Sequence, residues 1–581
     1  MNEPFTMIDA FSVSHANAIL NFTKDYCAGK SELLNSMSFK RVLQMHIAYL
    51  KRKDKPLYHT LIAIRNNDEE LAEDLLNILK MLLVLDTKSL SSAHPDLQKY
   101  LLNKPALIDF VETLFAYWRS LQRYAVIYST QEGQDIQNAY FVQSHNDFKE
   151  MILSSYKIVM EKLTKRSQSV YRQVIAGVNA GLVLNSTPLD FATDTYAIFR
   201  EIPVIQSIYL TPPFITYSRR NTRDGIFQEV MENPLTNQRL DAQKFICYPA
   251  KVGKYLALVY FHTDFMAMGI TLANLFEMAS PAEVHSRKPD LIYAYGVEDG
   301  KQGTAFYHDK ERNMMVGYAS YSEEIDYFGY MKKMLLTLHN VKGINGQGLP
   351  LHGAMAVITM NNDVTKHVVI IGDSGAGKSE TLEALRGLED NGIKEIKIIF
   401  DDMGIIYDEG GQVRAYGTEI GAFVRLDDLD PSYAYSEIDR AIFMNPDRIN
   451  ARVVIPVATY EEIVRGYPID LFLYANNYSD DPNNAMDIMT NLEEAKQVFI
   501  DGARMAKGTT QEVGLVKSYF ANPFGPVQRK EQTDKLLDQF FTLLAKNRTE
   551  IGQLKTRLGI KGNETSGPKD AAIALLAYLN K

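Results

Sequence analysis

Hydrophobic residues recur at intervals of three and four along the first 180 residues of this 581-residue chain. In DEELAEDLLNILKMLLVL (68–85) this spacing predicts that one helix face carries Leu71, Leu75, Ile78, Leu79, Leu82 and Leu83, and acidic residues at its start complement the helix dipole. Segments 107–127 and 147–164 have the same texture. The pattern predicts a helical N-terminal region over residues 1–180, with Trp118 in its core rather than in a ligand site.

The pattern changes near residue 185 to short apolar runs separated by proline, glycine and asparagine. Such runs are typical of strands in a mixed or antiparallel sheet. We expect a helix over 325–341 and a glycine-rich connector over 342–350. These elements predict a mixed α/β domain over residues 181–345, with strands in IPVIQSIYL, FITYS, KFICYPA and KYLALVYFH.

Strands and helices continue together through residues 346–581. The runs AMAVITM, KHVVIIG, EIKIIFDD, RVVIPVA and IDLFLYA are typical of strands, and KDAAIALLAYL is typical of a helix. This mixture predicts an α/β domain built on a central sheet. The fold class expected for the whole chain is α/β, mixed with α+β features.

Composition and charge limit the classes of partner that the chain is expected to bind. The 62 Lys and Arg residues are dispersed among 71 Asp and Glu, with a net charge of −9, which argues against nucleic-acid binding. Cys27 and Cys247 lie too far apart in sequence to indicate a disulfide framework. The most apolar windows are shorter than the roughly 20 residues that span a bilayer, and the first residues lack a secretory leader pattern. We therefore expect a cytoplasmic protein that binds neither nucleic acid nor membrane.

A phosphate-binding loop is the most specific motif. GDSGAGKS (372–379) satisfies G-x-x-x-x-G-K-[ST] between an apolar strand and a helical segment. Its glycines allow backbone N–H groups to face phosphate oxygens, its lysine supplies a positive charge, and its last hydroxyl can bind Mg²⁺. The predicted nucleotide-binding residues are Gly372, Asp373, Ser374, Gly375, Ala376, Gly377, Lys378 and Ser379.

Several other residues become candidate site residues once this loop is taken into account. Asp401 and Asp402 end the apolar strand IKIIF, where an acid meets the metal ion of a bound nucleotide. His352 in LPLHGAMAV, taken alone, is typical of a buried core histidine, and the adjacent Lys332 and Lys333 in YFGYMKKM would pass for a solvated pair.

Together these motifs resemble the phosphoenolpyruvate carboxykinases, in which a tyrosine, paired lysines and a histidine precede a phosphate-binding loop. Further segments are similar to family elements in the same order, over roughly residues 215–581. They are RRNTRDGIF (219–227, a looser match), DDMG (401–404), EGG (409–411), NAR (450–452), GTTQEVG (508–514) and SYFANPFG (518–525).

The resemblance implies a reaction that converts oxaloacetate and a nucleoside triphosphate, expected to be ATP, to phosphoenolpyruvate, CO₂ and a nucleoside diphosphate. It implies that Lys333, His352 and Asp402 hold Mn²⁺, and that Ser379 and Asp401 contact the Mg²⁺ of the nucleotide. Because a lysine ligates a metal only as a neutral amine, the pKa of Lys333 would have to lie well below about 10.4. The cation and the neighbouring Lys332 would lower it. A bound cation would then stabilise the enolate left by decarboxylation.

By the same resemblance, Arg220 would bind a substrate carboxylate and Arg452 would bridge the substrate and the γ-phosphate. Tyr327 would pack against the organic acid, and residues 181–345 would form the substrate-binding domain. Lys378 would contact the β- and γ-phosphates.

Some features depart from that family. GDSGAGKSE, with Glu380, is more similar to the loop of the HPr kinase/phosphorylases, which phosphorylate a protein serine. NETSGP (563–568) lacks the basic residue expected in an adenine pocket, so GTP and pyrophosphate remain alternative donors. The helical N-terminal region is also unlike the family, and is interpreted as scaffold or as a binding surface for a protein partner. Two other functions therefore stay open: a kinase acting on a protein or another small molecule, and a nucleotide-binding regulatory protein without turnover.

Overall fold

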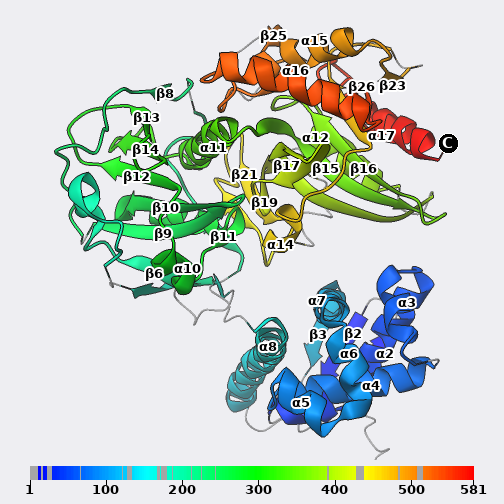
Figure 1. Cartoon of the computed structure of the whole chain (residues 1–581). Coiled ribbons are helices and arrows are strands. Elements are labelled where there is room, and N and C mark those ends of the chain that lie inside the picture. The colour runs from blue at the N-terminus through cyan, green and yellow to red at the C-terminus, as the bar shows by residue number, and fades with distance from the viewer. Residues whose placement is uncertain are drawn as a thin grey trace, which may run out of the picture. The chain divides into compact units, whose positions relative to one another are not determined.

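The computed structural model describes most of residues 11–580 and divides the chain into two compact units, Met1–Gln168 and Ser169–Lys581 (Figure 1). Residues 181–345 and 346–581 thus lie in the same unit. The residues between 11 and 580 that are not described are 15–16, 22–28, 66, 121, 127–133, 166–169, 172–179, 186–187, 211, 224, 243, 389–391, 427–428, 430–436, 482–483 and 507–513.

The N-terminal unit is mainly helical. The leucine and isoleucine face predicted within 68–85 is confirmed, because Leu71, Leu75, Ile78 and Leu82 are buried, and Trp118 packs against the same core. The helices are α1 (Lys30–Asn35), α2 (Met37–Arg52), α3 (Pro56–Ile62), α4 (Asp68–Leu82), α5 (Thr87–Ala93), α6 (Gln98–Leu102), α7 (Lys104–Ser120) and α8 (Gln134–Thr164).

The prediction of a helix through residue 127 is wrong. Helix α7 ends at Ser120, and β3 (Gln122–Val126) instead pairs in parallel with β2 (Asn17–Asn21), which is antiparallel to β1 (Phe11–Ser14). A pairing partner 105 positions away in the β-ladder register (Asn17 with Gln122) overrides the local helical pattern.

The second unit contains a ten-stranded mixed sheet and the four-stranded sheet β19-β21-β20-β7. The four strands predicted between residues 202 and 262 are confirmed as β6, β7, β9 and β10. The ten-stranded sheet comprises β4 (Val170–Tyr171), β5 (Ala180–Asn185), β6 (Val204–Leu210), β8 (Gln228–Glu229), β9 (Phe245–Val252), β10 (Tyr255–His262), β11 (Glu277–Met278), β12 (Leu291–Val297), β13 (Thr304–Asp309) and β14 (Met314–Ser320). The four-stranded sheet comprises β7 (Phe214–Thr216), β19 (Gly421–Arg425), β20 (Ile442–Met444) and β21 (Arg452–Pro456).

Helix α11 (Phe328–Asn345) carries the lysine pair; it begins three residues later and ends four residues later than the predicted 325–341. Nearly all of its residues are buried, and β15 begins at Leu349, so the expected connector shrinks to residues 346–348. The added residues include the buried Gly343 and Ile344, and the absence of a side chain at Gly343 lets the side chain of Ile405 approach closely.

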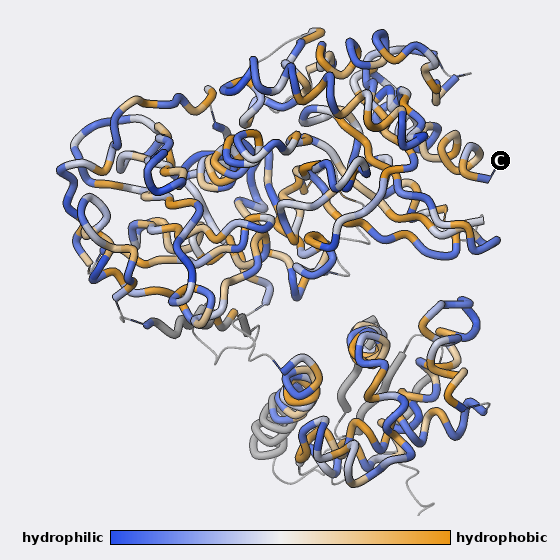
Figure 2. The backbone as a smooth tube through the Cα atoms, viewed as in Figure 1, coloured by the Kyte–Doolittle hydropathy of each residue, from blue (hydrophilic) through white to orange (hydrophobic). Residues whose placement is uncertain are grey.

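A seven-stranded sheet in the order β18-β17-β15-β16-β22-β26-β23 places the phosphate-binding loop. Apolar side chains alternate between its two faces: Val369 and Phe472 contact the core beneath α15 and α16, whereas Val368 and Leu471 contact the core beneath α12 and α17. The backbone tube of Figure 2 is coloured by hydropathy and marks the apolar residues along the chain. The strands are β15 (Leu349–Met360), β16 (Thr365–Ile371), β17 (Ile393–Glu409), β18 (Gln412–Gly417), β22 (Leu471–Asn476), β23 (Met486–Ile488) and β26 (Glu550–Lys555); the helices are α12 (Lys378–Arg386), α15 (Leu492–Asp501), α16 (Lys530–Lys546) and α17 (Ser566–Leu579).

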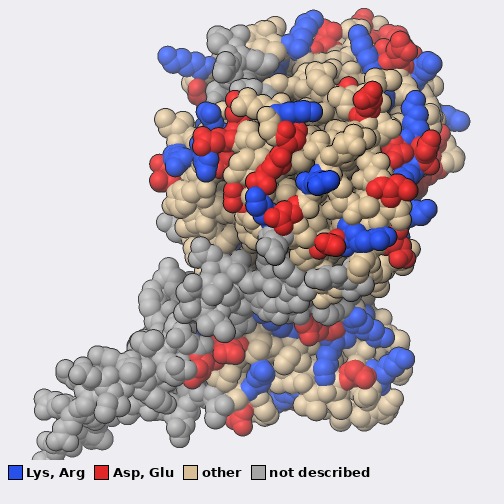
Figure 3. Space-filling model, turned by 90° about the vertical axis from the view of Figure 1, so that its left-hand side faces the viewer, with Lys and Arg blue, Asp and Glu red and all other residues tan. Residues whose placement is uncertain are grey.

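The predicted strands and C-terminal helix of this region are confirmed, and the chain as a whole is mixed α/β with several mixed sheets. A small hairpin, β24 (Ala503–Met505) with β25 (Leu515–Lys517), lies outside the main sheets. On the face drawn in Figure 3, lysines and arginines are interspersed with acidic residues over the described surface. None of the described helices is both long and apolar enough to span a bilayer.

Candidate active site

The phosphate-binding loop connects β16 to α12 at the end of the central sheet. Strand β16 runs parallel to β22, so the loop leaves the carboxyl end of a parallel pair, where ligands bind in open α/β sheets. Gly375 and Gly377 have φ of +77° and +94°, which only glycine adopts readily. The buried ammonium of Lys378 donates to the carbonyl oxygens of Gly372 and Asp373 at 2.7 and 3.1 Å, so it already points into the loop.

Two acidic residues lie in the middle of β17, directly after its buried run Ile398–Phe400 and beside this loop. Adjacent residues of a strand normally point to opposite faces, yet Asp401 and Asp402 both line one cavity. Asp402 has φ of +145°, a conformation that L-residues rarely adopt and that costs about 1 to 3 kcal/mol. Asp401 accepts a hydrogen bond from the hydroxyl of Ser379 at 2.7 Å. The unusual backbone at Asp402 therefore brings both carboxylates to the site.

Asp402 is the centre of a buried cluster of charges. One carboxylate oxygen, Oδ2, lies 2.5 Å from Nζ of Lys332 and 2.7 Å from Nζ of Lys333, and the other, Oδ1, lies 2.9 Å from Nε2 of His352. Burial alone would raise the pKa of Asp402, but the two lysines hold it well below its usual range. Asp402 is therefore a carboxylate at neutral pH.

The two lysines differ in their surroundings. Burial alone would lower the pKa of Lys332, but Asp402 and Glu419, the latter 3.0 Å away, raise it. Burial lowers the pKa of Lys333. The negative charge of Asp402 raises this pKa, and the positive charge of Lys332 lowers it further. Burial raises the pKa of Glu419 to about 7 despite Lys332. Lys332 thus keeps its proton, whereas Lys333 is the amine that can lose one.

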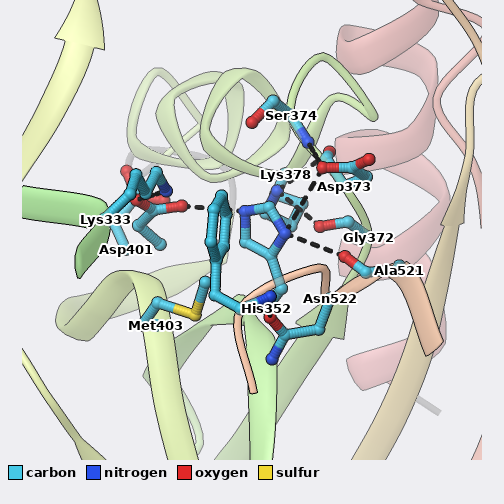
Figure 4. A network of polar contacts seen from close by, with 12 residues as sticks. Lys333, His352, Gly372, Asp373, Ser374, Lys378, Asp401, Met403, Ala521 and Asn522 are labelled. Carbon is cyan, nitrogen blue, oxygen red and sulfur yellow. Dashed lines mark hydrogen bonds and ion pairs between the residues drawn. The ribbon is translucent and has the colours of Figure 1, made fainter. Parts of the chain in front are cut away.

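His352 faces two hydrogen-bond acceptors (Figure 4). Its Nδ1 lies 2.8 Å from the carbonyl oxygen of Ala521, which can only accept, so Nδ1 carries a proton. The left-handed backbone of Phe520 and Ala521, with φ of +52° and +49°, orients that carbonyl. Burial lowers the pKa of the imidazole, which favours its neutral form with a lone pair on Nε2. Nε2 and Asp402 Oδ1 are then two acceptors in contact, an arrangement that a shared cation would satisfy.

The donor set fits a divalent cation. Lys333 as a neutral amine would supply an amine nitrogen, His352 an imidazole nitrogen through Nε2, and Asp402 a carboxylate oxygen. This combination of nitrogen and oxygen ligands suits Mn²⁺. Over the described ranges no group of three or more His, Cys, Asp or Glu side chains could hold a metal ion. The third protein ligand of this set is therefore of another type, the Lys333 amine.

A cavity of about 900 Å³ connects this cluster with the phosphate-binding loop. Tyr327 and Arg452 line it, as expected. The guanidinium of Arg452 lies 5.4 Å from the ring centroid of Phe423, and its buried Nε has no hydrogen-bond partner among the described residues. Such a donor is available to an anionic ligand.

Arg220, predicted to bind substrate, does not line this cavity. It is exposed, and its backbone N–H donates to the carbonyl of Asp326 at 3.1 Å. Arg223, three residues later, lines the cavity instead, with its guanidinium 5.0 and 5.3 Å from the ring centroids of Phe227 and Phe524. The motif RRNTRD contains three arginines, so the sequence indicated the segment but not which arginine reaches the site.

Three further charged residues of the site carry no local sequence signal. Glu419 follows β18, Arg425 ends β19 opposite Arg452, and Arg504 in β24 pairs with Asp373 of the phosphate-binding loop at 2.9 Å. Only the tertiary fold brings them here. GTTQEVG (508–514), one of the segments that resembles the carboxykinases, lies outside the described residues except for its last glycine.

No protein-family model matches the chain, and no curated protein matches it in sequence.

Proposed function

We propose that the chain is a phosphoenolpyruvate carboxykinase-like enzyme. It would decarboxylate oxaloacetate and transfer the γ-phosphoryl group of a nucleoside triphosphate, ATP by expectation, to the enolate oxygen. The products are phosphoenolpyruvate, CO₂ and the nucleoside diphosphate. The observation that supports this best is the convergence of Lys333 and His352 on Asp402, in one cavity with the phosphate-binding loop.

Lys333, His352 and Asp402 would hold one divalent cation, and Ser379 with Asp401 would contact the Mg²⁺ of the nucleotide. A cation at the first position supplies Lewis-acid stabilisation for the negative charge that decarboxylation leaves on oxygen. A protein kinase has no need for this buried lysine–histidine–aspartate cluster. The cluster therefore favours an enolate acceptor over a serine.

The remaining residues would bind and orient the reactants. Arg223 and Arg452 would bind the carboxylates of the organic acid, and Arg452 would also reach the γ-phosphate. Lys378 would leave its two loop carbonyls to contact the β- and γ-phosphates. Tyr327, which is buried at the cavity wall, would pack against the substrate. Such positioning is the main contribution that a protein makes to phosphoryl transfer.

A coupled assay for phosphoenolpyruvate tests the proposal directly. Oxaloacetate would be supplied with ATP, GTP or pyrophosphate, together with Mn²⁺ and Mg²⁺. Lys333→Ala and Lys378→Ala should each lower kcat/KM at least about 100-fold, because the first removes a proposed ligand of the cation and the second removes a positive charge at the β- and γ-phosphates. Lys342→Ala is the matched control: it lies in the same helix, is buried, and contacts Asn313 and Asp290 rather than the cavity. Folded protein that forms no product with any donor would exclude this reaction.

A second candidate is a kinase with another acceptor. Glu380 and Glu383 in the first turns of α12 line the cavity next to Ser379, where the HPr kinase-like loop places a carboxylate. Phosphoryl transfer from labelled ATP to a protein or small-molecule acceptor, without any oxaloacetate decarboxylation, would favour this alternative.

A further inference from the structure

The phosphate-binding loop contains a buried ion pair that is remote in sequence. Asp373, the second residue of the loop, accepts a hydrogen bond from Nε of Arg504 at 2.9 Å, and the two side chains are only 10% and 4% exposed. Both residues line the cavity that holds the loop. Arg504 comes from the β24–β25 hairpin, 131 positions along the chain.

Asp373 changes the chemistry of the loop. Its Oδ1 accepts the backbone N–H of Ser374 at 2.7 Å and lies 3.5 Å from Nδ1 of His352 (Figure 4). Backbone N–H groups of this loop type normally face phosphate oxygens. The Asp373 carboxylate therefore accepts the hydrogen bond of one of these N–H groups, that of Ser374, and adds a negative charge where a polyanion would bind. Both effects weaken phosphate binding unless a cation compensates for them.

Arg504 is placed to provide that compensation. Its Nε donates a hydrogen bond to the Asp373 carboxylate at the cavity wall. A guanidinium presents several donors in a rigid fork, so one edge can hold a carboxylate while the other binds a phosphate. We propose that Arg504 contacts the phosphate chain of the donor nucleotide, and that Asp373 is its positioning residue. This inference rests on the proposed triphosphate binding but not on the identity of the acceptor.

A purely structural role makes a different prediction. If Arg504 only neutralises Asp373, replacing both residues with neutral partners of similar shape should leave phosphate binding unchanged, because the net charge stays the same. If Arg504 contacts phosphate, the same double replacement should weaken binding. Replacing Arg504 alone would not separate the two roles, because it leaves a buried carboxylate unpaired and can disturb the loop.

The experiment is isothermal titration calorimetry of the full chain with inorganic tripolyphosphate and Mg²⁺. The double variant Asp373→Asn with Arg504→Gln should bind at least about tenfold more weakly than the unaltered protein, and Arg504→Lys, which keeps the charge but not the fork, should bind at an intermediate level. Arg557→Gln is the matched control, since Arg557 is also buried, pairs with Asp480 and Asp570, and lies outside the cavity lining. It should keep the affinity of the unaltered protein.

Two results would overturn the inference in distinguishable ways. Equal affinity of the double variant and the unaltered protein would leave the donor site intact and assign the pair a structural role. Failure of the unaltered protein to bind tripolyphosphate would instead remove the proposed donor site, and the role of Arg504 with it. Circular dichroism melting of each variant separates loss of binding from loss of fold.

Discussion

Asp402→Asn is the most informative single change, because Asp402 neutralises several buried groups at once. Two lysine ammonium groups lie 2.5 and 2.7 Å from one of its oxygens. Lys332 would keep Glu419 as an ion-pair partner, but Lys333 would be left without its carboxylate. Removing one partner of a buried ion pair typically costs about 3 to 5 kcal/mol. We expect a loss of that size in the local stability of the second unit.

The neighbouring Asp401 gives a matched control. It is also half-buried at the cavity, but its contact is the Ser379 hydroxyl, and desolvation raises its pKa. Its charged form is therefore disfavoured by the fold, and an asparagine at this position can still accept the hydroxyl. Asp401→Asn should change stability by less than about 1 kcal/mol. The two substitutions are chemically identical and differ by one position, so their difference isolates the charge cluster.

Hydrogen exchange in EDTA at pH 7 measures the effect. Tryptophan fluorescence would miss it, because Trp118 is the only tryptophan and lies in the N-terminal unit. Amides of α11 and β17 should exchange about two to four orders of magnitude faster in Asp402→Asn, since each 1.4 kcal/mol is a factor of ten. Equal exchange rates in the Asp401 and Asp402 variants would refute the view that the cluster is an ion-pair network that stabilises the fold.

Three further predictions concern other parts of the chain. Burial lowers the pKa of His46 from 6.5 to about 4, so the unfolded chain binds this proton more readily; the His46 contribution to stability, about 3 kcal/mol, should be lost as pH falls from 6.5 to 4. His46→Asn should remove that difference in urea unfolding followed by fluorescence. Gly353→Ala would place Cβ 2.6 Å from the Ile370 carbonyl oxygen and should cost about 1 to 3 kcal/mol in thermal unfolding, unlike Gly387→Ala, where the nearest contact is 3.3 Å. In the phosphoenolpyruvate assay, Arg223→Lys should raise KM for oxaloacetate about tenfold, whereas Lys in place of the exposed Arg220 should leave KM unchanged.

Local patterns predicted the elements that hold the site, because those elements are set by nearby residues. The strand–loop–helix around residues 372–379 and the strands on either side follow directly from apolar runs and glycines. Strand β3 and the end of α7 did not follow, because β3 depends on a partner near residue 17. The C-terminal extension of α11 to Asn345 was also not predicted, because this part of the helix contains a glycine that local helix propensity disfavours and is buried in the folded chain.

The candidate site itself was predictable only in part. Motif spacing identified Lys333, His352 and Asp402, and the structure brings them into contact. Motif spacing could not identify the carbonyl of Ala521 or the side chain of Arg504, because neither their residue type nor their position in the sequence distinguishes them. The Ala521 contact depends on the left-handed backbone of Phe520 and Ala521, and the Arg504 contact depends on the β24–β25 hairpin, which is distant in sequence from the loop.

The lysine pair shows why this cluster is more than a coincidence of charges. Adjacent residues of a helix point about 100° apart, yet Lys332 and Lys333 reach the same oxygen of Asp402. Glu419 holds the first lysine from its other side, so that the positive charge stays on Lys332. The second lysine, next to that charge and buried, is the one whose proton is destabilised. An ion pair built only for stability needs one lysine per carboxylate. Two lysines that share one carboxylate oxygen, with a histidine facing the other, are therefore the arrangement on which we base the proposal that the Lys333 amine would act as a metal ligand.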